Sequence, residues 1–196
     1  MKRIVAKGLL WVMSTMALVR AVRYLALLLL GGFLEPSDFG RFAAIFVVVN
    51  GIALFQGFGL GPALLYRRER VREAADTIFL LSAVLGLGFL ALAWVGAPLV
   101  ERFFGEQGLA GPFRVCALVI LFRALQTVPV RLFEKDLVFR SKLVPGLAGS
   151  VTYASVAVVL AYRGAGVWSL VFAEASAGLV ETCAYWLISA WRPRFR

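Results

Sequence analysis

The sequence lacks histidine and has few charged residues. The absence of His among the 196 residues excludes His-based acid–base catalysis, His ligation of a metal ion and a Ser-His-Asp triad. The two cysteines, Cys116 and Cys183, stand apart in apolar surroundings without Cys-x-x-Cys spacing. Neither a disulfide framework nor a metal site is therefore expected, and no cofactor is predicted.

Apolar residues dominate instead. They make up 61% of the chain, charged residues make up only 16%, and the mean hydropathy is +0.86. Soluble domains carry about 25% charged residues, so this composition is typical of an integral membrane protein. A spanning helix needs about 20 apolar residues. The length then allows six such helices and leaves no room for a soluble domain.

The apolar runs define these helices. Three of them are free of charge, and three contain charged residues within the run. Apolar sequence continues directly after the basic N-terminus, so the first run is expected to be a retained helix and not a cleaved signal. The predicted fold is all-α, with residues 1–196 forming one domain of six transmembrane helices at 8–34, 42–66, 77–100, 109–130, 143–162 and 164–191.

The positive charges are distributed unevenly along the chain. With the N-terminus in the cytoplasm, 14 of the 21 Lys and Arg residues fall in cytoplasmic segments, and 3 fall in the outer links. Cytoplasmic loops of membrane proteins carry such an excess, so both termini are predicted to be cytoplasmic. Contact with anionic lipid then explains the basic pI, and no nucleic-acid partner is needed.

Charged residues inside the predicted spans are the strongest functional candidates. A charge at the centre of a bilayer costs about 2.5 kcal/mol or more, so such residues face a partner or a wet cavity. Arg20 and Arg23 share one face of the first helix, and Glu174 and Glu181 share one face of the last helix. Arg123 lies on the fourth helix.

Two interpretations of these residues remain open, and they are compatible. In the first, Arg20 or Arg23 pairs with Glu174 or Glu181 and holds the first and last helices together. In the second, the first, fourth and last helices surround an aqueous cavity with a surplus of positive charge, which favours an anionic substrate. The substrate-binding candidates are Arg20, Arg23, Arg123 and Gln126, and the candidates for proton transfer or ion pairing are Glu174 and Glu181.

Several segments resemble one known family. The stretch EPSDFGRFAAIFVVVNGIALFQGFGLGPALLYRRE resembles the link between the first and second helices, together with the second helix, of bacterial polysaccharide or lipopolysaccharide biosynthesis flippases. These oligosaccharide flippases belong to the multidrug/oligosaccharidyl-lipid/polysaccharide exporter superfamily. The resemblance continues in order through FRVCAL, Val128-Pro129, Phe139-Arg140, RGAGVWSLV and the terminal WRPR.

The resemblance implies a non-enzymatic function in the bacterial inner membrane. A flippase of this kind translocates a polyprenyl-diphosphate-linked oligosaccharide for cell-surface polysaccharide or lipopolysaccharide biosynthesis. The implied partners are that lipid-linked oligosaccharide and the lipid bilayer. The family has two lobes of six or more helices, and this chain resembles the N-terminal lobe. A second six-helix lobe or a homodimer is therefore expected to complete the transporter.

Three alternatives remain. The same fold also serves exporters of other amphipathic substrates, and an isolated lobe can be inactive. A membrane-bound enzyme of the same pathway would need clustered carboxylates or a nucleophile–base pair at a membrane face. The acidic residues predicted for the cytoplasmic loops instead stand beside basic residues, which favours solvated surfaces: Glu69, Glu73, Asp76, Glu134 and Asp136.

Overall fold

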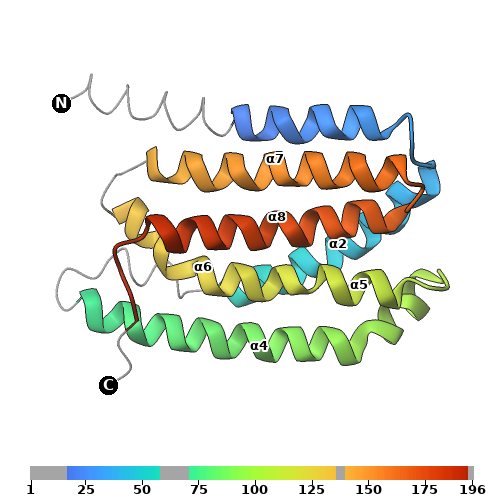
Figure 1. Cartoon of the computed structure of the whole chain (residues 1–196). Helices are drawn as coiled ribbons and strands as arrows, with labels where there is room; N and C mark the ends of the chain where they lie inside the picture. The colour runs from blue at the N-terminus through green and yellow to red at the C-terminus, as the bar shows by residue number, and fades with distance from the viewer. Residues whose placement is uncertain (1–16, 58–70, 136–139, 194–196) are drawn as a thin grey trace.

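The computed structural model describes residues 17–57, 71–135 and 140–193, and these ranges contain helices and no strand. Residues 17–30 are helical and are followed by the labelled helices of Figure 1. Their bounds are α2 Pro36–Gly57, α4 Val71–Phe104, α5 Ala110–Cys116, α6 Leu118–Lys135, α7 Arg140–Tyr162 and α8 Val167–Ile188.

Five segments of the described chain are long and apolar enough to cross a membrane. They are 36–55, 72–104, 110–134, 143–162 and 167–188, and α5 and α6 together make one of them. The all-α, multi-pass membrane fold predicted from the sequence is confirmed. The predicted first helix, 8–34, is helical over 17–30, and its residues 8–16 lie outside the described ranges.

Several helix boundaries differ from the prediction. The helix predicted at 42–66 already begins at Pro36, and the one predicted at 77–100 runs from Val71 to Phe104. Both extensions include polar residues, because a helix satisfies its own backbone hydrogen bonds beyond the apolar core of a membrane. The last helix is shorter than predicted, since residues 164–166 form the turn before α8.

The helix predicted at 109–130 is divided at Ala117 into α5 and α6. The N–H of Ile120 donates to the carbonyl of Ala117, 2.9 Å away and only three residues earlier. Such a contact tightens the turn relative to a regular α-helix. Pro129, by contrast, lies inside α6.

The helices lie side by side in one bundle (Figure 1). The helix at 17–30 runs along α7, α7 packs against α8, and α8 contacts α5 and α6 on its other side. The turns that join these helices gather at two opposite ends (Figure 1). The links 31–35, 105–109 and 163–166 share the end that the charge pattern assigns to the outer face.

Small residues lie at the contact between α7 and α8. A Cβ added to Gly149 of α7 would lie 3.3 Å from the Cβ of Glu181 and 3.4 Å from the carbonyl oxygen of Ala177. Ala157 and Ala173 are fully buried in the same region. Close approach at small residues is the usual way in which membrane helices gain packing energy.

Candidate functional site

The interior of the bundle contains an ion pair between the first and last described helices. Arg23 donates from Nη1 to Oε2 of Glu174 over 3.2 Å. Glu174 on α8 is only 5% exposed. The guanidinium carbon of Arg23 also lies 4.9 Å from the centre of the Tyr153 ring on α7, a cation–π contact. Three helices are therefore joined by one arginine.

A second arginine is held on the other side of α8. Arg123 of α6 donates from Nη1 to Oδ1 of Asn50 on α2 over 2.8 Å. The amide nitrogen of Asn50 in turn donates to the carbonyl of Phe46, 2.7 Å away and one turn earlier. This backbone contact fixes the orientation of the amide, so that its oxygen faces Arg123.

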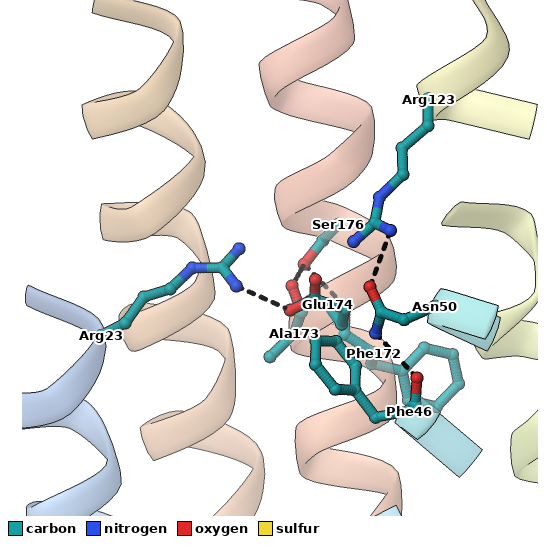
Figure 2. A network of polar contacts seen from close by, with 8 residues as sticks. All are labelled: Arg23, Phe46, Asn50, Arg123, Phe172, Ala173, Glu174 and Ser176. Atoms are coloured by element: carbon teal, nitrogen blue, oxygen red, sulfur yellow. Dashed lines mark hydrogen bonds and ion pairs between the residues drawn. The ribbon is translucent and has the colours of Figure 1, made fainter. Parts of the chain in front are cut away.

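Figure 2 shows how the two arginines lie relative to Glu174. Arg23 extends from one side and Arg123 from the other, and both reach the part of α8 that carries Glu174 and Ser176 (Figure 2). These three charged groups carry a net charge of one positive unit. Among the described residues, the guanidinium of Arg123 makes a single hydrogen bond, to Asn50, so its remaining N–H groups are available to an anion.

The other candidates occupy different positions. Gln126 lies one turn beyond Arg123, and its Oε1 is buried without a hydrogen-bond partner among the described residues. Glu181 packs against Gly149 at the α7–α8 contact. Arg20 is exposed on the helix at 17–30. The structure thus brings Arg23, Arg123 and Glu174 together and leaves Arg20 apart from them.

Two members of the polar network were not among the residues predicted from the sequence. Asn50 is the only strongly polar residue in the apolar run 42–55, and that isolation was a signal that could have identified it. Tyr153 carries no such signal, because a tyrosine in a membrane helix is common at interfaces and in cores alike. Only its position under Arg23 reveals its role.

A separate contact closes the outer end of the bundle. Asp38, at the start of α2, accepts a hydrogen bond at Oδ1 from the backbone N–H of Val167, the first residue of α8, over 3.1 Å. Gly166 adopts a φ of +55°, and a Cβ there would lie 3.1 Å from the same carboxylate oxygen. The two sequence segments EPSDFGR and RGAGVW are therefore adjacent in space.

Removal of this contact is expected to destabilise the bundle. Asp38→Ala leaves one N–H at the start of α8 without an acceptor, which costs about 1 kcal/mol. For a chain of this size the melting temperature should fall by about 2–4 °C. Thermal unfolding in detergent measures it, with Ser37→Ala as the matched control, because Ser37 contacts only the exposed Glu35 side chain. An equal shift for both variants would contradict the capping role.

In the described part of the chain, no three His, Cys, Asp or Glu side chains are grouped so as to hold a metal ion. The fold and the polar network define the chain as a multi-pass helical membrane protein with half-buried arginines between its helices. A family model described as "Polysaccharide biosynthesis protein" matches residues 29–196. The chain belongs to this family, and the resemblance to polysaccharide biosynthesis flippases found in the sequence is confirmed.

One curated relative is described as a transport protein. The succinoglycan biosynthesis transport protein ExoT of Rhizobium meliloti (strain 1021) is 26% identical to this chain over 174 residues. The match covers 89% of this chain and 35% of the relative, so the chain spans well under two thirds of the relative's length. No solved structure matches the chain significantly.

Proposed function

We propose that this chain forms one lobe of a transporter that translocates a polyprenyl-diphosphate-linked oligosaccharide across the bacterial inner membrane. The translocated oligosaccharide would be used in cell-surface polysaccharide or lipopolysaccharide biosynthesis. The observation that carries the proposal is the pair of arginines, Arg23 and Arg123, that reach the interior from opposite sides of α8. Membership in a polysaccharide biosynthesis family supports the substrate class.

The chemistry of the two arginines suits a diphosphate. A guanidinium binds phosphate oxygens through paired, charge-assisted hydrogen bonds, which are stronger than those between neutral groups. Before substrate binds, Glu174 and Asn50 hold Arg23 and Arg123 in place. The diphosphate would replace the neutral contact of Arg123 with Asn50 and would bind Arg23 through N–H groups that do not face Glu174. The unpaired Oε1 of Gln126 offers an acceptor for a sugar hydroxyl.

Translocation by alternating access needs a second lobe. Two lobes rock about a site that lies between them near the middle of the bilayer. We propose that the partner is another six-helix lobe, and a second copy of this chain is the alternative. Even helix numbers place both lobes in the same orientation, so either partner would leave the two halves parallel.

Binding of the lipid diphosphate is the direct test. The protein is reconstituted in nanodiscs, and its affinity for undecaprenyl diphosphate is measured for the wild type and for Arg123→Gln. Loss of one charge-assisted contact, worth about 1.5–3 kcal/mol, should weaken binding by at least tenfold. The matched control is Arg114→Gln, because Arg114 is exposed and donates only to the carbonyl of Trp94.

The proposal also predicts the transport phenotype. In cells that depend on this protein, Arg123→Gln should abolish export of the sugar polymer, while Arg114→Gln should leave export unchanged. Unaltered binding and export in a folded Arg123→Gln variant would make Arg123 a structural residue and overturn the proposal. Preferential binding of an uncharged amphiphile over undecaprenyl diphosphate would favour an exporter of another substrate.

A further inference from the structure

An apolar groove runs between α2 and the end of α4, and neither Arg23 nor Arg123 lines it. Its volume is about 520 Å³, and it is lined by Val48, Leu99, Val100, Arg102, Phe103 and Phe104. Leu99 is 67% exposed and Phe103 is 83% exposed. These residues lie at the end of the apolar segment 72–104, which is long enough to cross a membrane.

The residues that line the groove show the direction in which it runs. Leu99 and Phe103 are four residues apart on α4, as are Val100 and Phe104, so they form two adjacent rows along the helix. Val48 of α2 supplies the opposite wall. The groove therefore follows the helix axes, which is also the direction of the hydrocarbon chains in a bilayer.

A positive charge marks one end of the groove. Arg102 lies in the last turn of α4, and the chain leaves the helix at Gly105, whose φ is +67°. At this end of the described bundle, Arg41 forms an ion pair with Glu106 over 2.9 Å. No carboxylate of the described residues forms an ion pair with Arg102. The exposed Arg102 side chain is thus placed at the height of lipid headgroups, next to an apolar slot.

We propose that this groove binds one anionic phospholipid, with an acyl chain along the two rows of α4 and the headgroup phosphate on Arg102. The apolar lining suits a hydrocarbon chain and nothing polar, and the arginine at its end complements the headgroup charge. An exposed arginine binds a phosphate through charge-assisted hydrogen bonds, and such an exposed ion pair contributes up to about 1 kcal/mol. The inference is independent of the proposed transport function.

Native mass spectrometry of the whole chain tests the site. Phosphatidylglycerol and phosphatidylcholine with identical acyl chains are titrated into the detergent-solubilised protein. The wild type should bind phosphatidylglycerol in preference, and Arg102→Gln should weaken that binding by up to about fivefold, the equivalent of about 1 kcal/mol. Arg163→Gln, which removes an exposed arginine from the α7–α8 turn at the same end, should change nothing.

A second variant tests the apolar part. Leu99→Trp fills the groove from an exposed position and should weaken binding of both phospholipids, while the protein stays folded. Equal losses for Arg102→Gln and Arg163→Gln, or full binding in Leu99→Trp, would overturn the site. Preferential binding of a polyprenyl phosphate over phosphatidylglycerol at the Arg102 site would also contradict the proposal that a phospholipid occupies the groove.

Discussion

Glu174→Gln is expected to destabilise the protein more than any other change of a polar residue described above. The substitution keeps the size of the side chain and removes the carboxylate that faces Arg23 at 3.2 Å. Glu174 is 5% exposed, whereas the Arg23 side chain that would lose its counter-charge is 34% exposed. Breaking one side of a fully buried pair costs about 3–5 kcal/mol; the partial exposure of Arg23 lowers this to about 2–3 kcal/mol, so the melting temperature in detergent should fall by about 4–12 °C.

The chain contains a matched control for this experiment. Glu106→Gln makes the same chemical change in the Arg41–Glu106 pair, whose side chains are 42% and 46% exposed. An exposed pair contributes at most about 1 kcal/mol, so the melting temperature should change by less than about 4 °C. The double variant Arg23→Gln with Glu174→Gln should recover part of the loss. Equal shifts in melting temperature for Glu174→Gln and Glu106→Gln would show that the interior pair stabilises the protein no more than the exposed pair does.

Gly149→Val is expected to have the second large effect, for a steric reason. A Cβ at Gly149 would already lie 3.3 Å from the Cβ of Glu181 and 3.4 Å from the backbone oxygen of Ala177. A branched side chain there would force α7 away from α8. The contact between these two helices is the most extensive one among the labelled helices. Overpacking of this kind costs about 1–3 kcal/mol, and occasionally more.

Gly88→Val separates this steric cost from the general effect of valine in a helix. Gly88 also lies inside a long helix, α4, but a Cβ there would have no heavy atom within 4 Å. The melting temperature should fall by about 2–12 °C for Gly149→Val and by clearly less for Gly88→Val. Comparable melting temperatures for the two variants would contradict the close α7–α8 packing.

The arrangement of the helices was predictable where hydropathy alone decides it. The charge-free run 143–162 coincides with the apolar part of α7, since the bilayer sets its length, whereas the runs 42–66 and 77–100 gave the right helices with displaced ends. The division at Ala117 was not predictable, because neither Pro nor Gly marks it and the prolines Pro98, Pro129 and Pro145 all lie inside helices. It depends on how α5 packs against α8, a tertiary contact that local sequence does not encode.

The buried network was predictable only in part. The cost of an intramembrane charge singled out Arg23, Arg123 and Glu174. The interaction partner of each charged residue was not predictable. Helical spacing shows which residues share one face of a helix, but it does not show which other helix packs against that face. Arg23 and Arg20 share a face by spacing, yet the structure gives only Arg23 a carboxylate. The contact of Arg123 with Asn50 needed the position of α2, which no periodicity supplies.

The Arg23–Glu174 pair also constrains the biogenesis of the protein, since its partners are 151 residues apart in the chain. At a synthesis rate of about 5–20 residues per second, the interval between the two is roughly 8–30 s. During that time Arg23 has entered the membrane and its counter-charge has not yet been made. The ion pair can therefore form only when α8 arrives, and a nascent chain that stops before α8 presents an unneutralised arginine within the membrane.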